Sequence, residues 1–265
     1  MDTNPQHKPF AEMDLPEVIY KYRTWSDEYH KKVITNRQVF LAPPSSFEDS
    51  FDCKNNVRYD LLSKEEKLEW IIYQLKDEFP GQESNFYVVR AKELYNDAPI
   101  SDNNKIQELQ HEQFLVYDQR IGILSLTANS MNAEMWKKYS DDFKGVCIGF
   151  NPIVMFEFLG GGGIVQYVDE LPIIYPEPKY NYLHQSYLQI YYKEKKWSFE
   201  EEYRTHTFQP YPLSMENRTI TLPPQAYKKI LLGPKMSDED KENLKKAIPP
   251  ELNHVEVMEL KDEDF

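Results

Sequence analysis

The sequence contains few of the residues that build metal centres and disulfides. Its 265 residues include two cysteines and six histidines. Cys53 and Cys147 form no CxxC pair, and the histidines form neither an HxH nor an HExxH pair. Metal sites need clustered ligands at defined spacing, and paired cysteines mark oxidising compartments. The sequence therefore predicts no metal cofactor and a protein kept in a reducing compartment.

Glycine is also scarce, and it is unevenly distributed. Four of the nine glycines form one run, Gly160–Gly163. This run has no G-x-G-x-x-G spacing before a helix and no Lys-Ser/Thr pair after it, so it lacks both common phosphate-binding patterns. We expect a plain loop at this position.

Long apolar segments are missing as well. No run of about 18 apolar residues occurs, which argues against a membrane-spanning helix. The start of the chain, Met1–Phe10, is polar and contains proline, and it lacks the apolar region of a signal peptide. These absences predict a cytoplasmic protein without membrane attachment.

Basic residues are fewer than acidic ones. The chain has 31 basic and 44 acidic side chains, which gives a formal net charge of −13. Residues 238–265 hold ten acids and four lysines, a local balance of −6, so nearly half of the net charge lies at one end. Because phosphate contacts need a basic surface, bulk nonspecific binding of nucleic acid is excluded. The aromatic content of 14% argues equally against disorder.

Alternating and periodic patterns predict an α+β fold. Strand patterns occur near residues 18–23, 38–42, 121–127, 145–150, 164–168, 203–208 and 227–232. Between the second and third of these, Ser63-x-x-Glu66 opens a helical pattern to Phe79, and a second helix should run from about Ser101 to Tyr117. We therefore predict one domain, residues 1–265, whose mixed sheet carries a helical insertion at about 60–120.

The C-terminal region predicts a separate supersecondary unit within this domain. A strand at about 227–232 is followed by a helix that begins at Ser237 and runs to Ala247, and then by a strand at His254–Leu260. A strand, a helix and a second strand in this order favour a parallel βαβ unit.

Two strand segments carry polar side chains suited to binding. In Tyr20-Lys21-Tyr22-Arg23 the alternation of a strand places Lys21 and Arg23 on one face, where such a pair can hold a phosphate or carboxylate. In Ser125-Leu126-Thr127 both hydroxyls project from one face and can orient a ribose or an amide. Alternatively, Tyr20–Arg23 is a solvated edge strand. The hydroxyls of Ser125 and Thr127 could likewise bond to neighbouring strands instead of a ligand.

A third segment, Glu200-Glu201-Glu202-Tyr203-Arg204, concentrates acids. If it is extended, Glu200 and Glu202 share a face, and mutual repulsion raises the pKa of at least one acid and creates a proton acceptor or cation stabiliser. An acidic helix N-terminus explains the same residues equally well. Trp136 is a further candidate, either as a stacking platform or as a core residue.

Several residue blocks together resemble a known family. They are Tyr20–Arg23, Pro44–Asp52, Leu124–Thr127, Met135–Tyr139 with Lys144–Phe150, and Trp197–Arg204. In this order they resemble the uncharacterised bacterial family catalogued as domain of unknown function 2971. That resemblance implies no activity.

A second resemblance implies a function. An arginine on an early strand, hydroxyls on a middle strand and Glu-x-Glu on a late strand are similar to the arginine–serine–glutamate pattern of mono-ADP-ribosyltransferases. This resemblance implies that Glu202 and Glu200 are catalytic. It also implies that NAD, as substrate, contacts Arg23, Ser125 and Thr127. Tyr22 and Trp136 are aromatic residues within the same blocks, and we expect them to contact the same ligand. Glu202 would stabilise the oxocarbenium-like centre as nicotinamide leaves.

The sequence thus leaves two hypotheses from different classes. In the first, the protein is an ADP-ribosyltransferase or NAD glycohydrolase, which acts on NAD or a related nucleotide and a macromolecular acceptor of unknown identity, in a role such as phage defence. In the second, it is a non-catalytic interaction or regulatory protein, and the three motifs only brace the fold. A shared pocket for Arg23, Ser125 and Glu202 would favour the first. Side chains that point into separate regions, or a Glu202 engaged by Arg204 on a helix, would count against it.

Overall fold

A computed structural model describes residues 14–265, so the polar start at Met1–Phe10 lies outside the described residues. Its centre is a seven-stranded sheet in the order β11-β10-β4-β1-β3-β8-β5. All neighbouring strands are antiparallel except β10 and β11, which are parallel. The strands are β1 (Ile19–Arg23), β3 (Ile121–Thr127), β4 (Val146–Phe150), β5 (Gly163–Ile164), β8 (Glu202–Phe208), β10 (Tyr227–Leu232) and β11 (Glu256–Glu259). The predicted α+β class and mixed sheet are confirmed.

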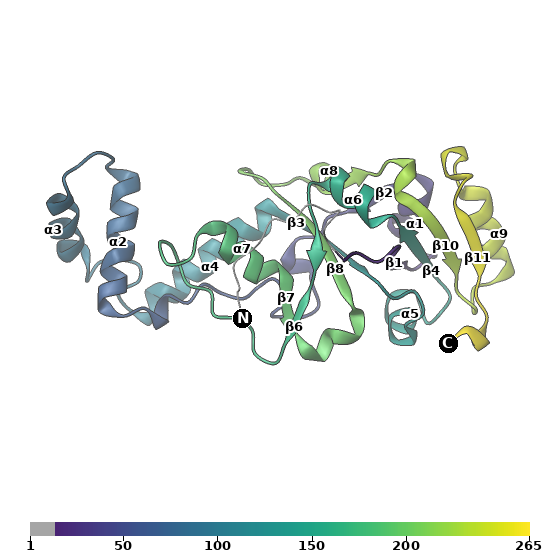
Figure 1. Ribbon diagram of the computed structural model, residues 1–265, viewed down its shortest axis with the longest axis horizontal. Helices are drawn as coiled ribbons and strands as arrows, with labels where there is room; N and C mark the ends of the chain where they lie inside the picture. Colours follow the sequence, from purple (N-terminus) through teal and green to yellow (C-terminus); the bar gives the residue numbers. More distant parts are fainter. Residues whose placement is uncertain (1–13) are drawn as a thin grey trace.

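Two small sheets and several helices surround this sheet (Figure 1). Strands β2 (Gln38–Phe40) and β9 (Thr219–Thr221) pair antiparallel, and β6 (Gln166–Val168) and β7 (Tyr192–Glu194) pair parallel. The helices outside the insertion are α1 (Glu28–Thr35), α5 (Ala133–Tyr139), α6 (Pro152–Leu159), α7 (Tyr182–Tyr191), α8 (Met215–Arg218) and α9 (Asp238–Ala247). Short 3₁₀ helices occupy Pro44–Ser46, Tyr59–Leu61, Lys195–Glu200, Pro224–Ala226, Pro250–Leu252 and Asp262–Asp264.

The helical insertion projects from one end of the molecule (Figure 1). It consists of α2 (Lys64–Glu78), α3 (Ser84–Leu94) and α4 (Asn103–Arg120), and it has its own apolar cluster. The predicted capping box is present, because Ser63 and Glu66 exchange hydrogen bonds at the start of α2. Helix α3 was not predicted. It has no side-chain cap and buries only Tyr87 and Ala91, so its apolar pattern is weak.

The C-terminal unit has the predicted form. Strands β10 and β11 pair in parallel, with α9 between them in the chain and capped by Ser237. The predicted strand at 164–168 is different: it is two short strands, β5 and β6, that belong to different sheets. The switch occurs at Val165, whose N–H donates to the carbonyl of Glu202.

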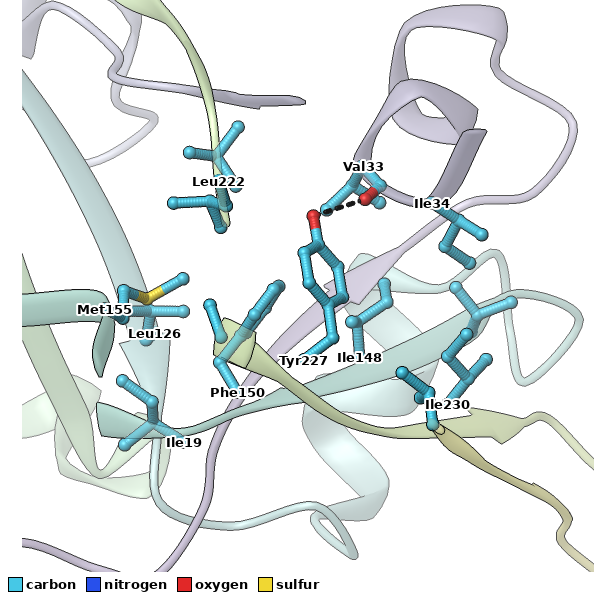
Figure 2. Close-up of a cluster of buried hydrophobic side chains, with 14 of the residues drawn as sticks. Ile19, Val33, Ile34, Leu126, Ile148, Phe150, Met155, Leu222, Tyr227 and Ile230 are labelled. Carbon is cyan, nitrogen blue, oxygen red and sulfur yellow. Dashed lines mark hydrogen bonds between the residues drawn. The ribbon is translucent and has the colours of Figure 1, made fainter. Parts of the chain in front are cut away.

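The main core lies on one face of the sheet, below helices α1 and α6 (Figure 2). Ile19, Ile148 and Ile230 come from three adjacent strands and are fully buried. Tyr227 crosses this core, and its hydroxyl donates to the carbonyl of Val33 on α1 over 2.6 Å. Burial of branched apolar side chains on this scale supplies most of the driving force for the fold.

The opposite face packs on helix α5. Tyr22, Cys147 and Leu231 lie in one row across three strands and meet Trp136, which is 0% exposed. The Trp136 indole N–H donates to the carbonyl of Ser130. Of the two interpretations of Trp136, its position therefore favours packing, because a stacking platform needs an accessible ring.

Candidate functional site

The site begins where two neighbouring strands separate. Strands β1 and β3 pair at one position, Tyr20 with Thr127. Beyond it the strands diverge toward Arg23, and the Lys21 ammonium donates instead to the carbonyl of Ser125 over 2.6 Å. A cavity of about 360 Å³ opens here, lined by both strands. Its volume is in the range of small-molecule sites.

Residues from distant parts of the chain line this cavity. Six of the seven sequence-predicted site residues are among them, and Trp136 is not. The six are Arg23 and Tyr22 on β1, Ser125 and Thr127 on β3, Glu202 at the start of β8, and Glu200 just before it. The structure therefore brings together the arginine, the hydroxyls and the acids.

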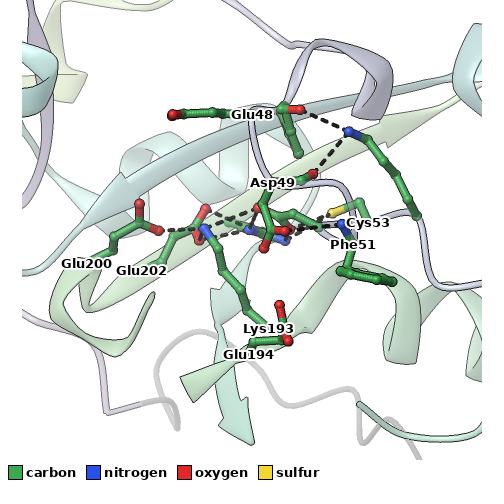
Figure 3. A network of polar contacts seen from close by, with 12 residues as sticks. Glu48, Asp49, Phe51, Cys53, Lys193, Glu194, Glu200 and Glu202 are labelled. Atoms are coloured by element: carbon green, nitrogen blue, oxygen red, sulfur yellow. Dashed lines mark hydrogen bonds and ion pairs between the residues drawn. The ribbon is translucent and has the colours of Figure 1, made fainter. Parts of the chain in front are cut away.

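The two acids do not lie on one extended strand. Glu200 ends the 3₁₀ helix Lys195–Glu200, and Glu201 adopts a left-handed conformation with φ of 43°. Their carboxylates nevertheless converge, because both contact the ammonium of Lys193, at 2.5 Å for Glu200 and 3.1 Å for Glu202 (Figure 3). Glu200 also accepts a hydrogen bond from the hydroxyl of Tyr139.

Arg204 completes a buried ionic cluster with Glu202. Its Nε and Nη2 each donate to one oxygen of the Glu202 carboxylate, both over 2.8 Å. The same guanidinium reaches Asp52, at 2.8 Å, and the backbone carbonyl of Ile190. Arg204 is 0% exposed and Glu202 is 3% exposed, so the pair lies outside bulk water. In this setting each charge depends on its partners for solvation.

Sequence reasoning missed two members of this cluster. Lys193 is 6% exposed and also contacts Asp52 over 3.1 Å. The aromatic, amphipathic pattern of residues 182–193 predicts a helix that includes Lys193, but α7 ends at Tyr191 and Lys193 lies on strand β7. Asp52 stands in the Pro44–Asp52 block of the family resemblance, and that block was the signal that could have identified it.

The expected repulsion among the acids does not raise the pKa of Glu202. Burial alone would raise it, but Arg204 and Lys193 outweigh burial and lower this pKa to about 2. A hydrogen bond from Ser125 acts in the same direction. Glu202 is therefore a carboxylate at neutral pH, which suits the stabilisation of a cation and does not suit proton acceptance.

The cluster retains negative charge toward the cavity. Three carboxylates, Asp52, Glu200 and Glu202, face two cations, Lys193 and Arg204, which leaves one net negative charge. Asp52, Lys193, Glu200 and Glu202 line the cavity directly. A developing positive charge beside Glu202 would therefore meet an attractive field.

The other part of the cavity is cationic. Burial lowers the pKa of Arg23 to about 10, and Asp27 only partly compensates. Within residues 14–265 no carboxylate lies within 4.0 Å of the Arg23 guanidinium, whose one hydrogen bond there is to the carbonyl of Tyr22. Burial, together with Arg23, lowers the pKa of Lys21 to about 7. Partly dehydrated cations without a carboxylate partner favour an anionic ligand.

The remaining predicted contacts differ in accessibility. Thr127 and Tyr22 are almost fully buried, and both bond to Asn129: Thr127 Oγ1 accepts from its N–H, and the Tyr22 hydroxyl donates to its carbonyl. Ser125 is partly exposed and opposite Arg204 in the β3–β8 ladder. Ser125 is therefore the hydroxyl best placed to touch a ligand.

The lowered pKa of Lys21 predicts that anion binding in the cavity depends on pH. We expect sulfate to bind roughly five- to ten-fold more weakly as the pH rises from about 6 to about 8, because the Lys21 ammonium is lost above its pKa of about 7. His30 nearby has a pKa lowered by burial and by Arg23, so its charge counts only at the acidic end. Calorimetric titration of the Lys21→Met variant should show a flatter pH profile.

A matched variant controls this experiment. Lys137→Met removes an exposed lysine of α5 that does not line the cavity, and the pH profile should persist. Sulfate binding that is independent of pH in the unsubstituted protein would show that Lys21 does not titrate in this range.

Two further classes of site were searched for across the described chain. Among residues 14–265 no group of three or more His, Cys, Asp and Glu side chains is arranged to hold a metal ion. In the same range no helix has the length and apolar character needed to cross a membrane.

Comparisons with models of known protein families, with curated protein sequences and with solved structures find no match. The resemblances to the bacterial family and to the mono-ADP-ribosyltransferases therefore stay predictions.

Proposed function

We propose that the cavity binds NAD and that the protein cleaves the bond between nicotinamide and ribose, with transfer of ADP-ribose to a macromolecule or to water. One observation carries this proposal. Arg23, Ser125 and Glu202 come from three distant segments, and all three line one cavity. A role in phage defence, in the cytoplasm that the composition predicts, is part of the same proposal.

The charges of the cavity suit the two ends of this substrate. Lys21 and Arg23 offer cations to the diphosphate, and an arginine can hold two phosphate oxygens at once. Ser125 lies between this pair and Glu202 and can contact the nicotinamide ribose. Cations that bind the diphosphate and an acid beside the ribose would together hold the substrate in one orientation. This orientation reduces the entropic cost of reaching the transition state.

The chemical step follows from the ionised state of Glu202. When the bond between C1′ of the ribose and the nicotinamide nitrogen breaks, its electron pair leaves with nicotinamide and neutralises the pyridinium ring. Positive charge then develops on the ribose, and the Glu202 carboxylate stabilises it. A hydroxyl, an amine or water adds to C1′ and releases one proton, which completes the balance.

A binding experiment tests the substrate assignment separately from catalysis. ADP-ribose lacks the bond to be cleaved, and we expect calorimetry to detect its binding. Arg23→Met should weaken it by about ten-fold or more, because a charge-assisted contact to phosphate is lost. Arg90→Met, at an exposed arginine of α3 paired with Glu93, should leave it unchanged.

The opposite outcome would favour the second hypothesis. If ADP-ribose does not bind, or binds equally to both variants, the cavity is not a nucleotide site. The three motifs would then brace the fold of a non-catalytic interaction protein.

A further inference from the structure

Helices α4 and α7 lie near the base of the helical insertion (Figure 1). Residues of both helices line a second cavity. It has a volume of about 580 Å³ and shares no lining residue with the first cavity. Helix α4 forms one side of this cavity. Most of the surface of α4 is accessible, because Ile106 is the one residue of this helix that is fully buried. This cavity plays no part in the proposed function.

Glutamines of α4 line the cavity with their amides held in one orientation. The Gln110 side-chain amide donates to the carbonyl of Val57, and that of Gln113 donates to the hydroxyl of Tyr59, both over 2.7 Å. In each case the amide nitrogen is the bonded atom. The amide oxygens have no hydrogen-bond donor among residues 14–265.

Helix α7 presents glutamines in the same way. The Gln185 amide donates to the carbonyl of Tyr180 over 2.8 Å, and the Gln189 amide donates to the carbonyl of Asn55 over 3.1 Å. Within the described part of the chain their oxygens likewise have no donor. Each of these four amides uses one N–H in its hydrogen bond, so each offers the cavity its acceptor oxygen together with a second N–H donor.

The remaining lining residues add negative charge and aromatic faces. Glu112 and Glu177 outnumber the single arginine, Arg120, so the lining carries net negative charge. The rings of Tyr182 and Phe208 lie 5.2 Å apart at its edge. Tyr117 also lines the cavity, and its hydroxyl is buried without a partner among residues 14–265.

We propose that this cavity binds the side chain of an arginine presented by a partner protein. A guanidinium is planar, offers five donors and no acceptor, and stacks on aromatic rings, which matches acceptor oxygens, carboxylates and ring faces. The net negative charge from Glu112, Glu177 and Arg120 favours this cation over a phosphate or carboxylate. Leu115 and Val116, each 46% exposed on α4, offer apolar contact to the chain around that arginine.

Calorimetric titration with a short peptide, Leu-Arg-Leu with blocked termini, tests this proposal. We expect it to bind about ten-fold more tightly than the same peptide with citrulline in place of arginine, because citrulline keeps the shape and loses the charge. Equal binding of the two peptides, or no binding, would overturn the proposal. Agmatine binding more tightly than the arginine peptide would overturn the assignment to a protein segment.

Variants of α4 locate the binding site. Gln113→Leu should weaken arginine-peptide binding by about five-fold or more, and Gln107→Leu, at an exposed glutamine of the same helix outside the cavity, should not. Glu112→Gln, at an exposed position, tests the charge independently if Gln113→Leu fails to fold. Full binding by Glu112→Gln and by a folded Gln113→Leu would place the peptide elsewhere.

Discussion

The Glu202→Gln variant should release nicotinamide from NAD about 10²- to 10³-fold more slowly than the unsubstituted protein, the usual cost of removing a transition-state charge contact. The substitution keeps the size of the side chain and removes its charge, so the ionic cluster loses its net negative charge. Glu202 faces the cavity as a carboxylate held ionised by Arg204 and Lys193. Chromatographic measurement of kcat/KM checks this result.

A neighbouring acid provides the matched control. Glu201 is exposed and does not line the cavity, so Glu201→Gln should keep nearly full activity. ADP-ribose binding should persist in both variants, which shows that each one folds and retains the nucleotide contacts. Undiminished nicotinamide release by Glu202→Gln would remove Glu202 from the mechanism.

Replacing Arg204 by methionine should lower the free energy of unfolding by about 3–5 kcal/mol, because breaking a buried ion pair leaves uncompensated charge. Arg204 is fully buried, and its loss would leave Asp52 and Glu202 with Lys193 as their shared cation. Urea denaturation followed by circular dichroism measures the change.

An exposed ion pair serves as the control, because it shows how little a surface pair contributes to the free energy of unfolding. Arg58 and Asp60 are 41% and 33% exposed, so Arg58→Met should change the free energy of unfolding by less than about 1 kcal/mol. If both methionine variants unfold at the same urea concentration, the cluster at Arg204 does not depend on its charges.

Local patterns were sufficient to predict much of the sheet. Alternation located the segments of β1 and β8, because half-buried strands impose a period of two, and apolar runs located the buried strands β3 and β4. Helix α3 and strand β7 could not be found in this way. Helix α3 buries few side chains, and β7 continues directly from the last residue of α7 with no breaker residue between them.

The part of the site that was predicted from the sequence lies mainly on regular strands. Arg23, Ser125 and Glu202 lie on regular strands, where residue type and spacing suggest a role. Lys193 and Asp52 act through ion pairs between residues up to 152 positions apart, and a single sequence does not show which distant residues pair. The lowered pKa of Glu202 was not predicted for the same reason, because its cationic partners Arg204 and Lys193 are distant in sequence or lie outside the acidic run.

The sequence also could not show which side chains are buried between the sheet and a helix. Trp136 lies in a short helix beside polar residues, a position compatible with either a ligand platform or the core. The packing of α5 against β1 and β4 decides between them and buries the ring. Burial of this kind depends on tertiary contacts and not on local periodicity.

Nicotinamide release from NAD by the unsubstituted protein, in the presence of bacterial lysate as a source of acceptors, tests the central claim most directly. The account predicts steady release that depends on the protein, with label from adenine-labelled NAD appearing as free ADP-ribose or on a macromolecule. Binding of ADP-ribose without any release of nicotinamide would contradict it, and would leave the cavity as a nucleotide-binding site without this chemistry.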